Sequence, residues 1–159
     1  MNILNEAKNY CYIMTPYLIL DNEFVNALSR AAARGVDVRI ITPGIPDKKT
    51  VWGVTRSFYE TLTRAGVRIF EYTPGFVHAK VFVSDDRVAT VGTINLDYRS
   101  LYLHFENGTC LIGSKKVMHI KKDTEDTLAQ CREITAREAK FGFFFNLKYS
   151  IIRIFAEQL

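Results

Sequence analysis

The sequence predicts an α/β fold in which a mixed β-sheet is flanked by helices. Strand-like and helix-like segments alternate twice between residues 10 and 66, a pattern typical of parallel βαβ units. Past residue 78 the rhythm changes to short strands around a tight turn, which indicates an antiparallel hairpin. The 159 residues are 48% hydrophobic and 24% charged, and these ordinary globular proportions exclude disorder and low complexity.

The first half of the chain begins with a short predicted helix at 2–9 and a buried strand at 10–15 that Pro16 ends. Asp21 suits the N-cap of the next helix, and Gly35 stands where a helix commonly ends. The elements predicted next are a strand at 36–42, a helix at 48–65 and a strand at 67–72.

The second half opens with the predicted hairpin, and a polar loop follows it. The elements expected there are strands at 79–84 and 88–92 around the turn Asp85-Asp86-Arg87, a loop at 95–100, a strand at 105–112, a charged helix from Ser114 to about Thr135, and a last helix from an Asn146 cap through Phe155. No linker or repeat interrupts the pattern, so residues 1–159 are expected to form one domain.

Charge and cysteine content narrow the functional classes. Lys and Arg number 21 and Asp and Glu 17, and the net charge of +4 suits an anionic substrate without requiring nucleic acid. The three cysteines, at 11, 110 and 131, lack ligand spacing, so we expect buried thiols and neither a disulfide framework nor a metal site. No stretch of 18 apolar residues is present, and Asn5, Glu6 and Lys8 interrupt any signal peptide.

One group of residues has the chemistry of phosphoryl transfer. His78 and Lys80 are two residues apart at a predicted strand start and therefore share a face. A neutral His78 imidazole can attack phosphorus, and a carboxylate such as Glu106 would fix its tautomer. Lys80 and the Asn95 carboxamide would stabilise the charge of the pentacoordinate state, and Thr93 offers a hydroxyl beside them.

These residues resemble a known signature. His78-Ala79-Lys80-x4-Asp85-x6-Gly92-Thr93-Ile94-Asn95 is similar to the HxKx4Dx6G(S/T)xN motif of the phospholipase D superfamily. The sequence that flanks this motif resembles the C-terminal catalytic half of bacterial cardiolipin synthases. The segments that carry this second resemblance are Thr15-Pro16-Tyr17, Tyr59-Glu60-Thr61-Leu62, Asn95-Leu96-Asp97-Tyr98-Arg99-Ser100, Phe105-Glu106 and Ile152-Arg153-Ile154-Phe155.

The resemblance implies one lobe of a phospholipase D-like fold that transfers a phosphatidyl group from phosphatidylglycerol through a phosphohistidine, giving cardiolipin when a second phosphatidylglycerol accepts it. It implies catalytic roles for His78, Lys80, Asp85, Asn95 and Glu106, with Lys80, Thr93 and Asn95 on the phosphate. It implies no metal or organic cofactor. From the residues alone, a structural role at the hairpin turn is favoured for Asp85.

The chain carries one HxK pattern, whereas this family pairs two; neither His104 nor His119 begins another. The expected partners are therefore a second lobe (a missing N-terminal half or a second copy), phosphatidylglycerol and a membrane surface, with membrane attachment through N-terminal segments absent from this chain. A homodimeric superfamily phosphodiesterase or nuclease is the alternative, although nucleic acid is not favoured. The non-enzymatic alternative is an inactive lobe that binds lipid or a partner protein.

Several further features leave alternatives open. Cardiolipin synthases usually have Ser in place of Thr93 and Asn in place of His104, and His104 could compete for Glu106. Asp97 and Arg99 either form an ion pair that holds their loop or touch a head group, and the first is favoured. The run Phe141-Gly142-Phe143-Phe144-Phe145 either enters a lipid interface or forms core or the seam with a second lobe, which is favoured. Four lysines, Lys115, Lys116, Lys121 and Lys122, predict a solvated helix face.

Overall fold

The computed structural model describes residues 1–155. Its centre is a mixed seven-stranded sheet of order β6-β5-β4-β1-β2-β3-β7, which confirms the predicted fold class. The elements are, in chain order, α1 (Asn2–Glu6), β1 (Tyr10–Met14), α2 (Asn22–Ala33), β2 (Asp37–Pro43), α3 (Lys49–Ser57), α4 (Tyr59–Arg64), β3 (Arg68–Tyr72), β4 (Val81–Ser84), β5 (Val88–Gly92), the π-helical turn η1 (Arg99–Leu103), β6 (Gly108–Ile112), α5 (Lys116–Leu128), β7 (Cys131–Ile134) and α6 (Phe143–Arg153).

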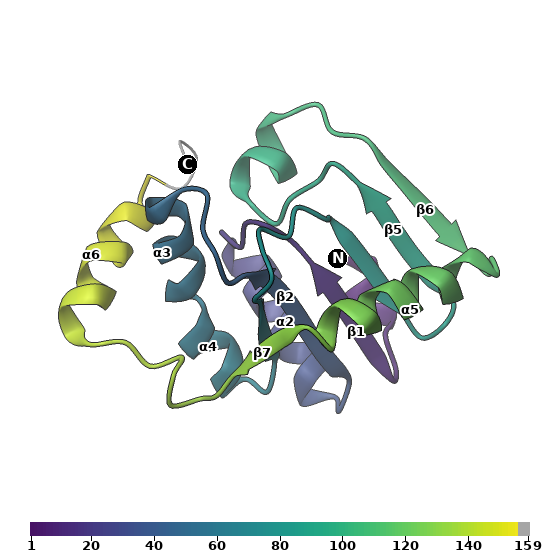
Figure 1. Cartoon of the computed structure of the whole chain (residues 1–159), viewed down its shortest axis with the longest axis horizontal. Coiled ribbons are helices and arrows are strands. Elements are labelled where there is room, and N and C mark those ends of the chain that lie inside the picture. Colours follow the sequence, from purple (N-terminus) through teal and green to yellow (C-terminus); the bar gives the residue numbers. More distant parts are fainter. Residues whose placement is uncertain (156–159) are drawn as a thin grey trace.

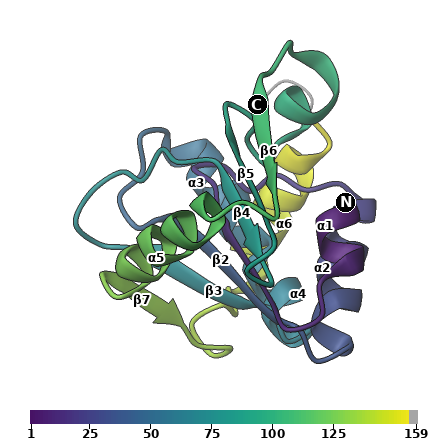
Figure 2. The same cartoon turned by 90° about the vertical axis from the view of Figure 1, so that its right-hand side faces the viewer.

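Two apolar layers hold helices on the two faces of the sheet. The larger layer joins α1, α2, α3 and α4 to one face, and the smaller one joins α5 to the other. Figure 1 shows α5 crossing in front of the sheet, and Figure 2 shows α1 and α2 on the opposite side. Along β1, Ile13 lies in the larger layer and Tyr12 in the smaller one, and both are buried, as a strand covered on both faces requires.

The first half follows the predicted βαβ pattern. β1, β2 and β3 are parallel neighbours, and the Asp21 carboxylate caps α2 by accepting the Phe24 N–H at 2.7 Å. The predicted helix at 48–65 is instead two helices, α3 and α4. The Ser57 hydroxyl donates to the Val54 carbonyl, and the Phe58 N–H turns to the Thr55 carbonyl. This competition between side chain and backbone interrupts the helix at Phe58.

The second half contains the predicted hairpin, because β4 and β5 pair antiparallel. Asp85 and Asp86 form its turn with positive φ angles of 52° and 57°, a region that aspartate tolerates better than most residues. The strand predicted at 105–112 begins only at Gly108, and β4 begins at Val81 rather than at residue 79. The residues from Phe105 to Asn107 form extended chain outside the strand.

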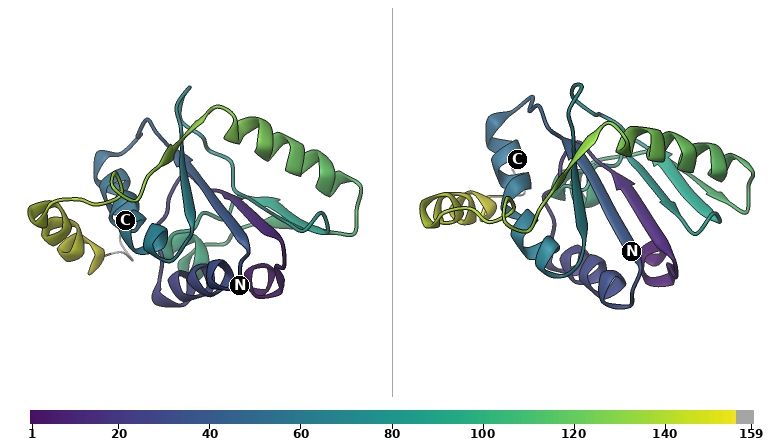
Figure 3. Two further views of the ribbon diagram at one scale, coloured as in Figure 1. Left: turned by 90° about the horizontal axis from the view of Figure 1, so that it is seen from below. Right: turned by 60° about the horizontal axis from the view of Figure 1, so that its bottom comes forward.

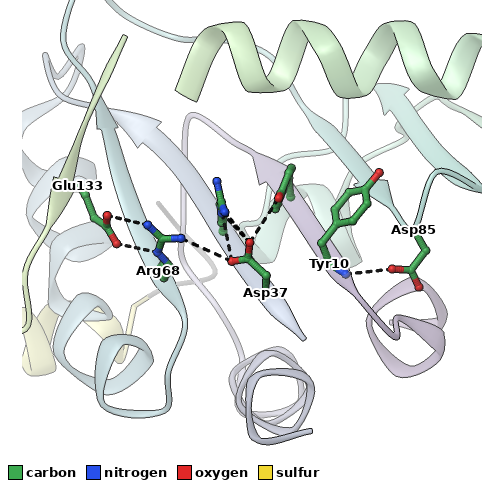
Figure 4. Close-up of polar contacts among 7 residues, drawn as sticks. Tyr10, Asp37, Arg68, Asp85 and Glu133 are labelled. Carbon is green, nitrogen blue, oxygen red and sulfur yellow. Dashed lines mark hydrogen bonds and ion pairs between the residues drawn. The ribbon is translucent and has the colours of Figure 1, made fainter. Parts of the chain in front are cut away.

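The C-terminal predictions need two corrections. The charged helix ends at Leu128, and its expected last turns are the edge strand β7, antiparallel to β3. Arg68 of β3 donates to Glu133 of β7 through two bonds of 2.8 Å, and Figure 4 shows Arg68 between Glu133 and Asp37. The last helix begins at Phe143, and the Asn146 amide donates to the Phe141 carbonyl rather than capping the helix.

Three smaller expectations concern the basic residues of α5, the cysteines and membrane-crossing helices. Lys115, Lys116 and Lys122 are exposed as predicted, with Lys122 paired to Asp126 at 2.7 Å. Lys121 is the exception, because it is half-buried, pairs with Asp86 at 2.7 Å and lies over the Tyr10 ring. All three cysteines are free, but only Cys11 is buried; Cys110 is exposed on the edge strand β6. None of the helices described within residues 1–155 has the length and apolar content needed to cross a bilayer.

Candidate active site

The candidate site lies where the carboxyl ends of the parallel strands meet the start of β4. Met14 at the end of β1 pairs with Val81 at the start of β4. Gly92 at the end of β5 pairs with Gly108 at the start of β6, and the Gly92 N–H donates to the Lys80 carbonyl at 3.3 Å. Alternating strand direction thus brings the residues before β4, after β5 and before β6 to one edge of the sheet.

His78 and Lys80 are in direct contact at this edge. The Lys80 Nζ lies 2.9 Å from Nε2 and 3.1 Å from Nδ1 of the His78 ring, and it donates to the His78 carbonyl at 2.8 Å. Burial lowers the pKa of Lys80, against the opposing pull of the Glu106 and Asp97 carboxylates. The His78 side chain is exposed, with its ring centroid 5.9 Å from that of Phe76. The His78 side chain is therefore open to solvent, with both ring nitrogens in contact with Lys80.

Thr93 positions Glu106. The Thr93 hydroxyl donates to the Glu106 carboxylate and accepts the Asn107 N–H at 3.0 Å, while the Thr93 N–H donates to the Asn107 carbonyl at 2.8 Å. The Thr93 bond is the main reason that the pKa of Glu106 lies below its usual value. Within residues 1–155 no hydrogen bond joins Glu106 to His78, so the orienting role of Glu106 stays a prediction.

Gly92 is required where β5 approaches the segment before β6. A Cβ at Gly92 would lie 2.3 Å from the Asn107 carbonyl oxygen and 2.6 Å from the Gly108 Cα. Both are backbone atoms that cannot yield locally. The glycine of the motif therefore permits the close approach that joins Thr93 to Asn107 and Glu106.

Asn95 lies on a loop fixed by Thr15. The Thr15 hydroxyl donates to the Tyr17 carbonyl at 2.7 Å and accepts the Leu96 N–H at 3.1 Å. The Asn95 amide donates to the Ser100 hydroxyl at 3.1 Å, but its buried Oδ1 has no partner within the described residues. Sequence reasoning missed the positioning role of Thr15. Both of its partners are backbone groups, and one of them, the Leu96 N–H, is 81 residues away in the chain.

Two hollows meet at Asn95. The larger, of about 460 Å³, is lined by His78, Lys80, Thr93 and Asn95 among others. The smaller, of about 190 Å³, is lined by Glu106, Asn95 and His104 among others. The His104 ring nitrogen is bonded to Arg99 at 3.1 Å, so Glu106 takes its hydrogen bond from Thr93 instead. Four of the five residues assigned to catalysis are thus gathered around adjoining spaces.

The loop charges differ from expectation. Asp97 accepts the Ser100 N–H at 2.7 Å, and Arg99 bonds His104. Asp97 and Arg99 therefore hold the loop through separate hydrogen bonds, and the expected ion pair between them is not among the salt bridges of residues 1–155.

Asp85 is the motif residue that the structure does not bring to the site. It follows β4, whereas His78 and Lys80 precede it, so the length of the strand separates them. Its carboxylate accepts the N–H groups of Lys8, Asn9 and Tyr10 at 2.7 to 2.9 Å, and Figure 4 shows it against the start of β1. These bonds fasten the hairpin to the α1–β1 connection, as the structural interpretation of Asp85 expects, and its catalytic role stays a prediction.

A metal centre has no obvious ligands here. Among residues 1–155, no group of three or more His, Cys, Asp or Glu side chains is placed to hold a metal ion. The acidic and basic side chains that line the two hollows, histidines included, are those of Lys48, His78, Lys80, Asp97, Arg99, His104 and Glu106.

Comparison with known proteins finds similar sequences among the cardiolipin synthases. The family model described as "Cardiolipin synthase, PLD-like domain" matches residues 1–128. An uncharacterized protein of Streptococcus mutans is 57% identical over 85% of this chain and 29% of its own length. Cardiolipin synthase 2 of Bacillus anthracis is 39% identical over 83% of this chain and 26% of its own length. The chain therefore spans less than a third of these curated relatives.

Solved structures share the fold at low sequence identity. Nuc, a phospholipase D family member from Salmonella typhimurium, has a TM-score of 0.72 and 19% identity over 83% of this chain and 86% of its own. Phosphatidylserine synthase from Haemophilus influenzae has a TM-score of 0.73 and 19% identity over 99% of this chain and 42% of its own. At these identities the likeness concerns the fold alone.

Proposed function

The chain belongs to the cardiolipin synthase family of phospholipase D-like domains, and from this premise we propose that it transfers a phosphatidyl group from phosphatidylglycerol to an alcohol. His78 is the nucleophile and a second phosphatidylglycerol is the acceptor. The observation that carries the proposal is the contact of Lys80 with both His78 ring nitrogens beside a hollow that Thr93 and Asn95 also line.

The proposed reaction has two displacements at phosphorus. In the first, a His78 ring nitrogen forms a bond to phosphorus, the bond from phosphorus to the glycerol oxygen breaks, and glycerol leaves with a proton from an acid. In the second, the acceptor hydroxyl loses its proton to a base and attacks phosphorus, and the bond to His78 breaks. The products are cardiolipin and glycerol, or phosphatidic acid when water is the acceptor.

Each remaining residue acts on charge or position. Lys80 and Asn95 line the hollow in which the nonbridging oxygens would gather charge. One N–H of the Asn95 amide is bonded to Ser100, so the Lys80 ammonium and the other amide N–H are assigned to those oxygens, where they stabilise the transition state more than the ground state. The Glu106 carboxylate, held by the Thr93 hydroxyl, stabilises the positive charge of the imidazolium. No step requires a metal ion or organic cofactor.

The chain contributes one of two half-sites in this proposal. One histidine can attack, but a second acid must protonate the leaving alkoxide, and the site described above offers no second imidazole beside His78 apart from His104, which Arg99 engages. The second lobe is either another part of a longer polypeptide or a second copy of the chain. The enzyme works at the surface of the membrane that holds its substrate.

Covalent trapping tests the function. Phosphatidylglycerol labelled in its acyl chains is mixed with the protein, paired with its second lobe where one exists, and quenched under alkaline conditions that preserve phosphohistidine. We expect label on the wild type, none on His78→Ala, much less on Lys80→Ala, and normal labelling of His119→Ala, which removes an exposed histidine of α5. Full turnover by His78→Ala would overturn the mechanism, and DNA cleavage without lipid labelling would favour a nuclease.

A further inference from the structure

The C-terminal helix α6 has two apolar faces, and only one of them is packed. Phe145 and Tyr149 face the body of the protein, with ring centroids 4.5 Å apart, and the Tyr149 ring lies where a Cβ at Gly53 of α3 would stand. Phe141 stacks on Phe145 at 4.2 Å. The aromatic run therefore divides: Phe141 and Phe145 pack inward, as the core interpretation expects, whereas Phe143 and Phe144 do not.

The opposite face of α6 is apolar and exposed. We call its five residues the outer arc: Phe143, Phe144, Leu147, Ile151 and Ile154, which are 73%, 83%, 47%, 52% and 75% exposed. At about 100° per residue they fall within one arc of about 100°. In Figures 1 and 3, α6 stands at the margin of the molecule beside α3. Exposed apolar side chains gathered this closely mark a contact surface.

The charges around the arc favour an anionic lipid interface as its occupant. Residues 139–155 contain no Asp or Glu, but they contain Lys140, Lys148 and Arg153. The Arg153 guanidinium lies over the Phe58 ring, 4.0 Å from its centroid, whereas Lys140 and Lys148 are exposed. Aromatic side chains bordered by lysines fit the boundary between acyl chains and anionic head groups, where the lysine stems lie along apolar surface and their ammonium groups reach phosphate.

The same charges disfavour a second copy of the chain on this face. A twofold interface places the same patch against itself, so the lysines that border the arc on one protomer would face a patch of the same charge on its partner, with no carboxylate within residues 139–155 of either copy to compensate. Like charges at a protein interface weaken binding. An anionic bilayer carries no such penalty.

The arc also connects to the candidate site. A groove of about 500 Å³ runs between the end of α6 and the loop after β5, lined by Arg153, Ile154, Asp21 and Tyr98 among others. Tyr98 is three residues beyond Asn95 on the loop that carries the carboxamide. A surface that engaged the arc would therefore lie next to the site loop.

We propose that the outer arc of α6 docks the protein on membranes rich in anionic phospholipid. The identity of the occupant rests on the proposed function, in which the substrate is such a lipid. Docking itself requires no turnover, so the two proposals can fail separately.

Fluorescence measures the docking directly. In a Trp52→Phe background, which removes the one native tryptophan, Phe144→Trp places an indole on the arc. We expect a blue shift and saturable binding with vesicles of phosphatidylglycerol and phosphatidylcholine, and little change with phosphatidylcholine alone. Co-sedimentation gives the affinity of variants without the probe. Phe144→Asp and Leu147→Asp are expected to weaken binding at least about tenfold, from the lost burial of one large apolar side chain.

Matched controls isolate the arc. Met118→Asp makes the same change from an exposed apolar side chain to a carboxylate on α5, where Met118 is 45% exposed, and we expect its affinity to stay within about twofold of wild type. His78→Ala is expected to bind vesicles normally, which separates docking from chemistry. Thermal melting of each variant checks the fold. Absence of wild-type binding to anionic vesicles, equal binding by Phe144→Asp and Met118→Asp, or self-association that only the arc variants abolish would overturn the proposal.

Discussion

At the scale of single residues, the site depends on one carboxylate and the hydroxyl that holds it. Glu106 lies in the segment before β6, and the Thr93 hydroxyl donates to its carboxylate. Lys80 is close enough for its charge to lower the pKa of Glu106 further. Lys80 lines the hollow that contains His78, and Glu106 lines the smaller hollow, which shares Asn95 with it. Under the proposed function, Lys80 stabilises the charge of the phosphorane and Glu106 supports the imidazolium.

Glu106→Gln is expected to slow phosphatidyl transfer by about 10² or more while leaving the melting temperature within about 2 °C. The amide keeps the shape but cannot support an imidazolium. Because the folded pKa of Glu106 lies below its ordinary value near 4.3, the carboxylate stays charged at pH 5 and above. The pH profile of turnover between pH 5 and 8 should therefore have the same shape in Glu106→Gln as in the wild type. An unfolded variant, or one with unchanged rate, would remove Glu106 from this role.

Asp85→Asn is expected to destabilise the protein by about 1–3 kcal/mol, since charge-assisted bonds to three backbone N–H groups are weakened. Asparagine tolerates the positive φ of 52° at this position, so the change tests charge rather than backbone strain. Urea unfolding measures the difference. Asp123→Asn, on the exposed face of α5, is the control for loss of one surface charge.

The wild type and Asp85→Asn are also expected to differ in how their stability depends on pH. Burial alone would raise the pKa of Asp85, but the amides of Tyr10, Lys8 and Asn9 outweigh it and lower the pKa. A folded pKa below the unfolded value of about 3.9 means that this stability is complete above the unfolded pKa and is lost as the pH falls through the folded one. The wild type and Asp85→Asn should differ by a constant amount above about pH 5 and converge below about pH 4. A difference that grew in acid would contradict the assignment.

At the scale of elements, the hydrophobic pattern predicted buried strands and amphipathic helices well and short edge structure poorly. β1, β2 and the hairpin were predictable because burial on both faces, or a turn between strands, leaves a strong sequence signal. β7 left almost none: Arg132 and Glu133 are exposed, only Ile134 is buried, and the strand forms by pairing with β3. The break at Phe58 coincides with the bond of the Ser57 hydroxyl to the Val54 carbonyl, a local contact that no periodicity records.

Gly92→Ala is expected to disturb the site through the sheet. The added Cβ would lie 2.3 Å from the Asn107 carbonyl oxygen, so β5 and the segment before β6 must move apart and Thr93 must lose its hold on Glu106. We expect a loss of about 1–3 kcal/mol of stability, the usual cost of overpacking, together with a large loss of turnover. Gly75→Ala is the control, because nothing lies within 4 Å of its added Cβ. Equal behaviour of the two variants would contradict this account of the motif glycine.

At the scale of the whole molecule, strand direction explains why much of the site could be predicted and part of it could not. His78, Lys80, Asn95 and Glu106 come together because β4, β5 and β6 alternate in direction, and a hairpin prediction already contains that information. Thr15 was beyond reach, since its bond to Leu96 crosses from β1 to a loop 81 residues later. The spacing of the motif also suggested that Asp85 belonged to the site, although the length of β4 carries it away.

The same scale yields the prediction on which the proposed function depends most. The chain alone should fold cooperatively yet turn over phosphatidylglycerol very slowly as a monomer. The leaving glycerol alkoxide has a pKa far above neutrality and needs a proton in the transition state, and general acid catalysis contributes about 10²–10⁴ in rate. His78 is exposed, so a second histidine can approach it from another lobe.

Light scattering and turnover on the same samples test this dependence on a second lobe. If two copies pair, specific activity should rise with concentration alongside the molar mass, and mixing wild type with excess His78→Ala should lower the rate per wild-type chain, because mixed pairs retain only one histidine. If the partner lobe lies elsewhere in a longer polypeptide, adding that lobe should raise turnover by about 10² or more. A strict monomer with full multiple turnover would instead require an acid within this chain. The first residue to replace would then be His104, which lines the smaller hollow together with Glu106 and whose backbone N–H donates to the Arg99 carbonyl at 2.8 Å.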